Sequence, residues 1–374
     1  MNSKLDIRSL TGAMMRFWKH NMMLTISMLA AVVTCFFVPP DQEYIRYFDG
    51  KTLVCLFCVL LIVRAFGATG LFGSLAGKLL SLCKTLRGAV LLLILITLIG
   101  SLLITNDMAL LAFLPLGYFM LKHANAEKYL AYVFIVQTMA ANLGGMLSPF
   151  GNPQNLYLYS YYSIGTGEFF NIMLLPFCVS VALTVVCCLF VPPLLIEPIA
   201  HTEQLPKRKI ALYAALFVVV IFAIFRIVPY PIALIVPFVI AFVDRKILKE
   251  ADYPLIFTFC AFFVFSGNLS RIPAVSDFLG NLVKEYPLLT AMGVSQIISN
   301  VPAAVLLSKF TDHFPSLLLG VNLGGVGTPV ASLASLITIR YYLRYQPSGK
   351  KEFSQLFALL NVAFLVLFLL IFAS

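Results

Sequence analysis

A doubled polar motif holds the residues of this chain whose types and spacing could do chemistry. Asn142-Leu-Gly-Gly145 is followed by Ser148-Pro149, and Asn322-Leu-Gly-Gly325 is followed by Thr328-Pro329 at the same distance. Amide, hydroxyl and glycine residues at matching places in two apolar halves are typical of the interrupted helices that bind substrate in membrane carriers. The motif therefore predicts one site to which both halves contribute.

A hydroxyl–Asn pair precedes each copy, at Thr105-Asn106 and at Ser299-Asn300. Each pair lies in an apolar segment, 88–121 or 287–311, that we expect to form a re-entrant hairpin with the pair at its tip. Helix starts at such tips offer free N–H groups to an anion, and unwound carbonyls on the other side suit Na⁺. Asp107 is a carboxylate at membrane depth and a candidate for ion or proton coupling. The alternative is that it only caps a helix.

The segments 129–161 and 315–345 are each expected to be one membrane crossing, interrupted by the Gly-Gly and Pro residues. Ser148-Pro149 and Thr328-Pro329 have the form of a helix N-cap followed by proline at the first helical position. Asn152-Pro153 offers a second start of the same kind. The glycines could unwind the chain or could serve close helix packing.

These segments supply the predicted ligands. The substrate-binding set is Thr105, Asn106, Asn142, Gly144, Gly145, Ser148, Asn152, Ser299, Asn300, Asn322, Gly324, Gly325 and Thr328. The ion-coupling set is Asp107, Thr105, Ser148, Ser299 and Thr328. Two Na⁺ positions are expected, one at Thr105, Asn106 and Ser148 and the other at Ser299, Asn300 and Thr328. The predicted site contains no lysine or arginine, and Arg64 is expected to have a structural or domain-interface role.

The composition indicates an all-α polytopic membrane protein. Hydrophobic residues make up 61% of the chain and charged residues 11%, whereas soluble domains carry about 25% charged residues. Apolar runs that approach the thickness of a bilayer occur at 22–38, 52–69, 169–191, 209–225 and 354–373. Most of the 26 lysines and arginines fall on one side of these runs. The positive-inside rule then predicts a cell-membrane protein with a cytoplasmic N-terminus and an outside C-terminus, and nucleic acid is not needed to explain the charge.

Two inverted repeats are expected to fill most of the chain, because Asp49–Leu79 aligns without gaps on Asp252–Leu282 and one extra helix separates the halves. The expected parts are a cytoplasmic segment 1–20, repeat 1 at 21–195, a linker and connecting helix at 196–228, and repeat 2 at 229–374. Repeat 1 would contain scaffold helices 22–69, an arm 70–85, the hairpin 88–121, the broken helix 129–161 and a closing helix 169–191. The counterparts in repeat 2 are 231–268, 273–285, 287–311, 315–345 and 354–373.

Hydroxyl–Asn tips together with Asn-Leu-Gly-Gly-x-x-Ser/Thr-Pro breaks resemble the ion transporter superfamily. That group includes citrate transporter-like permeases, sodium/dicarboxylate symporters, and the arsenite permease and sodium/proton antiporter branch. The resemblance implies a homodimeric elevator carrier, in which a scaffold of early helices holds a sliding transport domain of hairpins and broken helices. In the dicarboxylate symporters both tips read Ser-Asn-Thr. Here the third position is Asp107 in one half and Val301 in the other, which looks closer to the arsenite permease and proton-coupled citrate branches.

The leading prediction is a secondary active transporter that moves a small anion, a carboxylate or an inorganic oxyanion, and is coupled to Na⁺ or H⁺. The alternatives are a cation/proton antiporter that exchanges ions at Asp107, and an efflux permease for arsenite or a similar oxyanion. The sequence shows no nucleophile–base arrangement at membrane depth, so an enzyme is not expected. The expected partners are the small anion, the lipid bilayer and a second copy of the chain, with no cofactor beyond the coupling ion.

Overall fold

The computed structural model describes residues 21–196 and 205–372. This part of the chain consists of helices and their connections, and the one strand-like contact within it is an isolated bridge between Thr85 and Leu195. The all-α prediction is therefore confirmed. The expected cytoplasmic segment 1–20 and the C-terminal Ser374 lie outside the described residues, so the sides on which the termini lie stay a prediction.

The same order of elements occurs in both halves: a long helix, a short helix, a helix pair with a polar tip, a broken helix and a closing helix. In the first half these are α3 (Gly50–Ala68), α4 (Leu71–Leu80), α5 (Leu86–Ile104) with α6 (Asn106–His123), α7 (Leu130–Gly144) with α8 (Pro153–Tyr161), and α9 (Thr166–Leu189). In the second half they are α13 (Tyr253–Ser270), α14 (Pro273–Glu285), α15 (Pro287–Ile298) with α16 (Asn300–Leu307), α17 (Phe314–Leu323) with α18 (Leu333–Tyr345), and α19 (Lys350–Phe372).

The remaining elements precede or connect these sets. They are α2 (Met22–Cys35), α10 (Lys207–Ile224), α11 (Ile235–Val243) and α12 (Arg245–Lys249), together with the 3₁₀ turns η1 (Gln42–Tyr47), η2 (Glu127–Tyr129), η3 (Gly145–Leu147), η4 (Tyr230–Leu234) and η5 (Pro347–Gly349). Whether the two sets are related by an inverted symmetry, and whether they move as scaffold and transport domains, stays a prediction.

An aspartate N-cap starts the long helix of each set. The Asp49 carboxylate accepts a hydrogen bond from the Thr52 N–H at 3.1 Å, and the Asp252 carboxylate accepts one from the Leu255 N–H at 3.0 Å. Such a cap satisfies a free N–H group and lies favourably in the field of the helix dipole. The two segments that align in sequence thus begin with the same local interaction.

Six helical segments among the described residues are long and apolar enough to cross a membrane. They are Gly50–Ala68, Leu86–Ile104, Glu127–Leu147, Thr166–Leu189, Tyr253–Ser270 and Pro347–Phe372. The predicted runs 52–69, 169–191 and 354–373 lie in or largely within three of them. The other two predicted runs, 22–38 and 209–225, are weaker candidates for membrane crossings. Their helix α2 has only 14 residues, and their helix α10 begins with Lys-Arg-Lys. The chain is therefore a multi-pass membrane protein.

The second helix pair is too short for two membrane crossings. α15 has 12 residues and α16 has 8, which correspond to about 18 and 12 Å at a rise of about 1.5 Å per residue. The hydrocarbon core of a bilayer is about 30 Å thick. Because α15 packs against α16, as α5 packs against α6, these lengths are compatible with a hairpin that enters the membrane and turns back.

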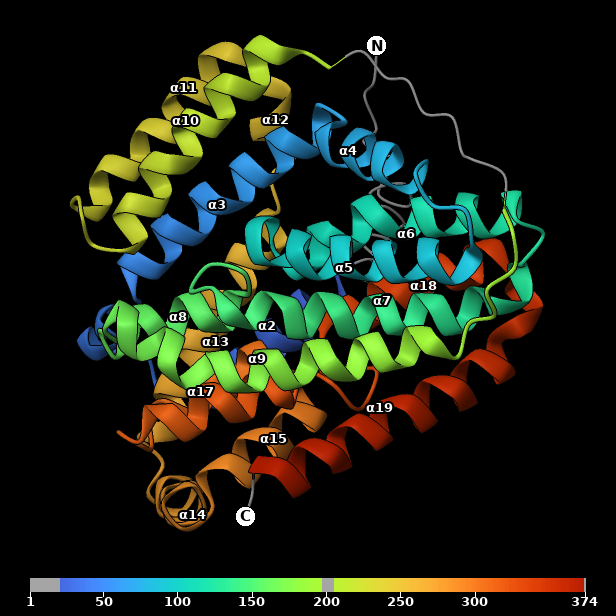
Figure 1. Cartoon of the computed structure of the whole chain (residues 1–374). Coiled ribbons are helices and arrows are strands. Elements are labelled where there is room, and N and C mark those ends of the chain that lie inside the picture. The colour runs from blue at the N-terminus through green and yellow to red at the C-terminus, as the bar shows by residue number, and fades with distance from the viewer. Residues whose placement is uncertain (1–20, 197–204, 373–374) are drawn as a thin grey trace, which may run out of the picture.

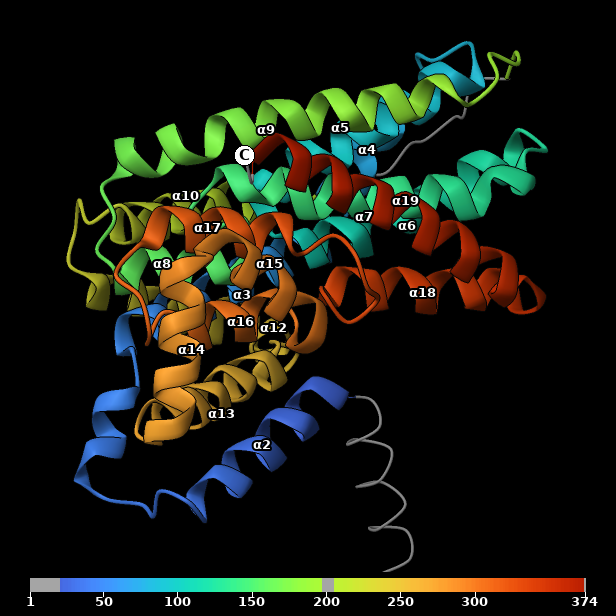
Figure 2. The ribbon, with the colours of Figure 1, turned by 90° about the horizontal axis from the view of Figure 1, so that it is seen from below.

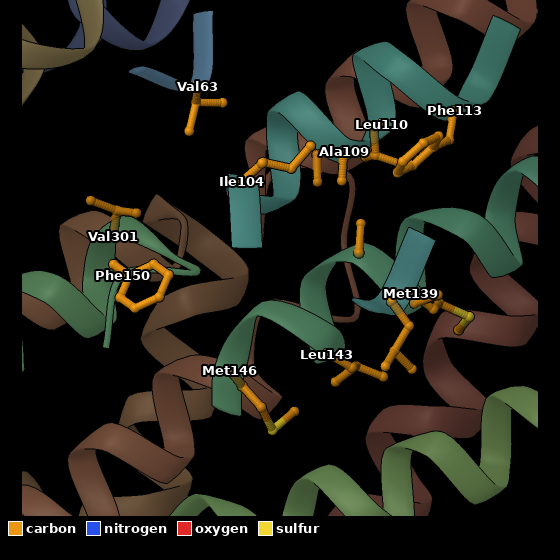
Figure 3. Close-up of a cluster of buried hydrophobic side chains, with 14 of the residues drawn as sticks. Val63, Ile104, Ala109, Leu110, Phe113, Met139, Leu143, Met146, Phe150 and Val301 are labelled. Carbon is orange, nitrogen blue, oxygen red and sulfur yellow. The ribbon is translucent and has the colours of Figure 1, made fainter. Parts of the chain in front are cut away.

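The hairpins lie on a core formed by the broken helices. Figure 1 shows α5, α7 and α9 running side by side, with α3, α10 and α11 gathered beside them, and Figure 2 shows α2 lying along α13. Around the first tip, Ile104 and Phe113 belong to the same buried cluster as Met139 and Leu143 of α7 (Figure 3). The cluster holds the tip in place, since close-packed interiors leave little freedom for movement.

Candidate substrate and ion site

Each hairpin turns at a hydroxyl residue with a positive φ. Thr105 has φ 72° and ψ 148°, and Ser299 has φ 79° and ψ 153°. Residues other than glycine rarely occupy this region, and the strain costs about 1–3 kcal/mol per residue. The turn ends α5 and α15 and allows α6 and α16 to start at the next residue. The same strained geometry occurs in both halves, so the surrounding structure must hold it.

The loop of the neighbouring broken helix holds the residue after each tip. The Asn106 N–H donates to the Gly151 carbonyl at 3.3 Å, and the Asn300 N–H donates to the Ala331 carbonyl at 2.9 Å. In both asparagines the side-chain oxygen also accepts the N–H of the following residue at 2.9 Å. Two free N–H groups at each helix start are thereby satisfied, and the side chains of the tips are fixed.

Asn142 connects the two halves of the chain. Its Nδ2 donates to the Gly325 carbonyl at 3.3 Å, and its Oδ1 accepts from Asn106 Nδ2 at 3.0 Å and from Ser332 Oγ at 2.8 Å. The side chain is buried, and its amide oxygen is already used by two donors. Asn142 therefore positions the tip and the start of α18 and has little capacity left to bind a substrate directly.

Asn322 makes the corresponding connection from the second half. Its Oδ1 accepts from Asn152 Nδ2 at 3.3 Å and from Gln154 Nε2 at 3.2 Å. Its Nδ2 donates to Asn155 Oδ1 at 2.6 Å and to the Leu318 carbonyl at 2.8 Å. These hydrogen bonds join the two halves through buried amides, although Asn152 Oδ1 and Gln154 Oε1 in the same network have no hydrogen-bond partner among the described residues. The predicted asparagines thus come together, with those of the Asn-Leu-Gly-Gly motifs acting as supports.

The predicted helix starts at Ser148-Pro149 and Thr328-Pro329 are wrong. The broken helices resume four residues later, with Asn152 and Ser332 at the N-cap positions. The second start predicted at Asn152-Pro153 is confirmed. Each Ser/Thr–Pro pair instead opens a β-turn, closed by backbone hydrogen bonds of 3.3 and 3.1 Å. Proline is favoured at the second position of a β-turn as well as at the first position of a helix, so the dipeptide alone does not distinguish the two.

The hydroxyls of these turns are fastened to the hairpins. Ser148 Oγ donates to the Leu102 carbonyl at 3.0 Å, and Thr328 Oγ1 donates to the Gln296 carbonyl at 2.8 Å. The two acceptors lie three residues before the respective tips. Ser148 and Thr328 therefore tie each break to its own hairpin.

The glycine pairs serve close packing. A Cβ on Gly144 would lie 2.4 Å from a backbone oxygen of α5, and one on Gly324 would lie 2.9 Å from a backbone Cα of α15. Gly145 and Gly325 lie similarly close to asparagine side chains of the site. The helix α7 continues through Gly144 before it ends. In the second half α17 ends at Leu323, so Gly324 and Gly325 lie in the break itself. Close packing accounts for all four positions, and the second pair also lies where the helix unwinds.

Two adjoining cavities lie at the tips. The smaller has a volume of about 20 Å³ and is lined by both tips, including Asn106, Asp107, Ser299 and Asn300. The larger has a volume of about 590 Å³, includes Thr105 and Asp107 in its lining, and extends between α2, α3, α13 and α18. Five of the predicted residues therefore line these spaces, while Ser148 and Thr328 line neither. Thr328 borders a separate cavity beside α19.

Charged residues line the larger cavity, whereas the predicted ligand set contains no lysine or arginine. Arg64 and Arg340 contribute positive charge, and Asp107, Glu250 and Asp252 contribute negative charge. Arg64 forms an ion pair with Glu250. The arginines come from α3 and α18, which are far apart in sequence, so no local pattern could have placed them together.

Several residues of the site were not predicted from sequence. Ser332 lies ten residues after Asn322, as Asn152 lies ten after Asn142, and this spacing could have identified it. Gln154 corresponds to Ala334 under the same alignment. Because it has no polar counterpart in the second half, the doubled motif does not identify it. Arg340 belongs to no doubled motif, and Asp252 entered the sequence analysis only as the start of the second aligned segment. Only the fold brings them to the cavity.

Comparison with known proteins identifies the family of this chain. The family model described as a citrate transporter matches residues 13–314. This chain belongs to the citrate transporter family. It is therefore a secondary transporter of the ion transporter superfamily, and the resemblance noted in the sequence is confirmed.

Two relatives cover most of the chain. The protein named uncharacterized transporter MJ0456, from Methanocaldococcus jannaschii, is 33% identical over 80% of this chain and 83% of its own length. The inner membrane protein YbiR of Escherichia coli is 28% identical over 83% of this chain and 85% of its own length. Both descriptions fit a membrane protein, and the first fits a transporter.

Proposed function

We propose that this protein moves a small carboxylate anion across the membrane together with Na⁺ or H⁺. The description of its family supports a carboxylate substrate. The observation that carries the proposal is the larger cavity, whose volume of about 590 Å³ lies within the roughly 300–1,000 Å³ of typical small-molecule sites. Arg64 and Arg340 line it, and a planar guanidinium matches a carboxylate with two parallel hydrogen bonds.

The charge balance of the larger cavity supports cation coupling. Two arginines face three carboxylates there, so the ionised cavity has a net charge of −1. An anion that enters it meets repulsion unless one carboxylate is protonated or paired with a bound cation. Asp107 is the carboxylate nearest the tips, since it lines both cavities. Binding of the cation and the anion would thus be thermodynamically linked.

The doubled element order supports an elevator mechanism. In this proposal α2, α3, α10, α11 and α13 form the scaffold, and the hairpins and broken helices form the transport domain. The larger cavity lies between these groups, since α2, α3 and α13 contribute one wall and α6 and α18 contribute another. We include a homodimer in the proposal, as the resemblance to the superfamily implies.

Uptake into proteoliposomes tests the proposal. Citrate, di- and monocarboxylates, phosphate and arsenite would be offered under imposed Na⁺ or pH gradients. We expect saturable, gradient-driven uptake of a carboxylate. We also expect an increase of about tenfold or more in KM for Arg340→Gln, because a charge-assisted hydrogen bond contributes about 1.5–3 kcal/mol.

A matched control is Lys209→Gln, which removes a cation paired with Asp244 at 2.8 Å outside the cavity. Its KM should stay at the wild-type value. Cation-driven proton flux without any transported anion would instead support the antiporter, which the three carboxylates of the cavity favour. Uptake of arsenite alone would support the arsenite permease. The two arginines would then not be substrate ligands, because arsenous acid is neutral.

A further inference from the structure

We propose that the end of the molecule where α10 begins and α11 finishes binds the headgroup of an anionic phospholipid, whose acyl chains lie against the exposed face of α11. This inference goes beyond the proposed function and does not depend on it, because the lipid is bound and not transported. Six basic residues define the headgroup site and form the basic cluster: Lys207, Arg208, Lys209, Arg245, Lys246 and Lys249.

The basic cluster combines two short runs that are well separated in sequence. Residues 207–209 open α10, and the other three belong to α12, which directly follows α11. Lys209 Nζ and Asp244 Oδ2 lie 2.8 Å apart and join the two runs, and Figure 1 shows α12 close to the start of α10. All six basic residues are exposed. The fold therefore gathers them on one surface that the solvent or a headgroup can reach.

The carboxylates of this surface do not balance its positive charge. Asp244 is paired with Lys209. Glu250 is paired with Arg64 and also lies 3.7 Å from Lys246 Nζ. Six cations against these two carboxylates leave a surplus of four positive charges, before Arg64 is counted. Binding of an anion would relieve the repulsion among them.

The remaining cations have no acidic partner in the described part of the chain. Lys207, Arg208 and Lys249 take part in no ion pair there. Arg245 donates from Nε to the Ala241 carbonyl at 3.1 Å, near the C-terminal end of α11. The first turn of α10 contains no acidic residue, although the helix dipole disfavours cations at that end. The cations at the start of α10 therefore lack the compensation that a phosphate group would supply.

An apolar face adjoins the basic cluster. Phe238 and Phe242 of α11 are 65% and 71% exposed, and their ring centroids lie 4.9 Å apart. The 3₁₀ turn η4 and α11 have 5 and 9 residues, which together extend about 24 Å. The hydrocarbon core of a bilayer is about 30 Å thick, so the bilayer thins here or the basic side chains extend to the headgroups. Either adjustment places the cluster at the level of lipid phosphates.

The charge and the apolar face together identify the ligand as a phospholipid. Groups of roughly four to eight lysines and arginines at the cytoplasmic end of a membrane helix attract anionic headgroups, and this end is cytoplasmic in the predicted topology. A free anion or an acidic protein would use the charges and leave the aromatic face of α11 uncovered. A second copy of the chain, related by a two-fold axis at this face, would bring two positive clusters together.

Thermal unfolding of the purified full-length protein tests the inference without any transported anion. The melting temperature would be measured in detergent with increasing phosphatidylglycerol, phosphatidylcholine or inorganic phosphate. We expect a saturable rise with phosphatidylglycerol alone, because a ligand that binds only the folded state stabilises it. An equal rise with phosphatidylcholine would overturn the selectivity for an anionic headgroup. An equal rise with inorganic phosphate would overturn the contact with acyl chains.

A variant of the cluster locates the site. It removes four exposed cations in the combination Lys207→Gln/Arg208→Gln/Arg245→Gln/Lys249→Gln. The half-saturating concentration of phosphatidylglycerol should rise at least tenfold, because each basic residue near the surface adds to the attraction for anionic lipid. Should this variant fail to fold, Lys207→Gln/Lys249→Gln is expected to raise that concentration at least threefold.

The matched control removes the same number of charges elsewhere. Four lysines outside the cluster are exposed and form no ion pair in the described part of the chain: Lys78, Lys84, Lys350 and Lys351. Their combined change to glutamine should leave the half-saturating concentration within about twofold of the wild-type value. Equal losses in the two variants would show that the lipid responds to the overall charge of the protein, and would overturn the site.

The inference and the proposed function fail in different ways. A wild-type protein whose melting temperature ignores phosphatidylglycerol, yet which accumulates a carboxylate, overturns the lipid site and leaves the carrier intact. The expected lipid response in a protein that transports no anion retains the lipid site and rejects the carrier. Light scattering of the same samples gives their mass. A cluster variant that keeps the wild-type lipid response but changes from dimer to monomer would assign this face to a second copy and overturn the lipid site.

Discussion

The hydroxyl residue at each tip has a backbone conformation that its side chain opposes. Thr105 and Ser299 occupy the same region of positive φ although one is β-branched. Strain of this kind persists only where the surroundings impose it, and it gathers at functional sites. The fold therefore holds a hydroxyl residue at each tip against a backbone cost, and Thr105 lines the larger cavity.

The strain predicts an inverted order of stability for two substitutions at the tips. At Thr105 and at Ser299, the glycine variant should be more stable than the alanine variant by about 1–2 kcal/mol, because only glycine adopts the local backbone freely. Thermal unfolding in detergent measures this difference. Ser354, an exposed residue within α19, is the control. Its glycine variant should be about 1 kcal/mol less stable than its alanine variant. Alanine variants that are the more stable at all three positions would show that the tips are not strained.

Single residues in the doubled motifs are the part of the site that the sequence predicts best. Thr105, Asn106, Asp107, Ser299 and Asn300 were selected by their repetition or their membrane depth, and the fold places them at adjoining cavities. Their roles as cation or substrate ligands remain predictions. The helix starts expected at the Ser/Thr–Pro pairs are wrong, because such a pair suits both an N-cap and a β-turn, whereas the start expected at Asn152-Pro153 is confirmed.

At the scale of elements, the apolar runs and polar tips located the helices within a few residues. The boundaries of α5, α6, α15 and α16 follow the expected arms, because a polar pair inside an apolar run can only mark a turn that avoids lipid. The contacts between elements could not be read in this way. Arg64 and Arg340 line one cavity because α3 and α18 pack around α6 and α13. The pattern of residues within either helix does not show that the two helices lie close together.

The packing of each broken helix on its hairpin predicts a clear contrast between glycines. Gly144→Ala and Gly324→Ala should each lower the free energy of unfolding by about 1–3 kcal/mol, because the new methyl group would meet backbone atoms that cannot move aside easily. Gly293 is the control: it lies in α15, and a Cβ there would meet nothing within 4 Å. Gly293→Ala should raise stability by up to about 1 kcal/mol. Equal losses at all three positions would contradict the packing role.

At the scale of the whole molecule, Arg226 forms a clamp between two parts that the proposed elevator separates. Arg226 follows α10 and joins it to the end of α8, donating hydrogen bonds to the carbonyls of Tyr159, Ser163 and Ile164 at 2.7, 3.0 and 3.0 Å. Its guanidinium also lies 4.7 Å from the centre of the Tyr159 ring. In the proposed elevator, α10 belongs to the scaffold and α8 to the transport domain. The contacts of Arg226 would then have to break in every cycle.

This clamp predicts a change in conformational equilibrium when it is removed. Arg226→Gln should lower the stability of the present conformation by about 1–3 kcal/mol and shift the population toward the other conformation. Exchange of substrate at saturation would then speed up if opening of the clamp limits the cycle. The shift is measurable as altered labelling of a cysteine placed in the larger cavity from each side of a reconstituted membrane.

The control for this prediction is Arg271→Gln. Arg271 donates to the Asp41 carboxylate at 2.6 and 3.0 Å and to Tyr47 at 3.0 Å, and all three residues lie in the α2–η1–α13 region of the proposed scaffold. Its hydrogen bonds lower the pKa of the Asp41 carboxyl, so the pair stays ionised at neutral pH. Arg271→Gln should reduce stability without altering which side of the membrane the cavity faces. If Arg226→Gln likewise reduces stability and leaves cysteine labelling unchanged, α8 and α10 move as one body, and the division into scaffold and transport domain must be drawn elsewhere.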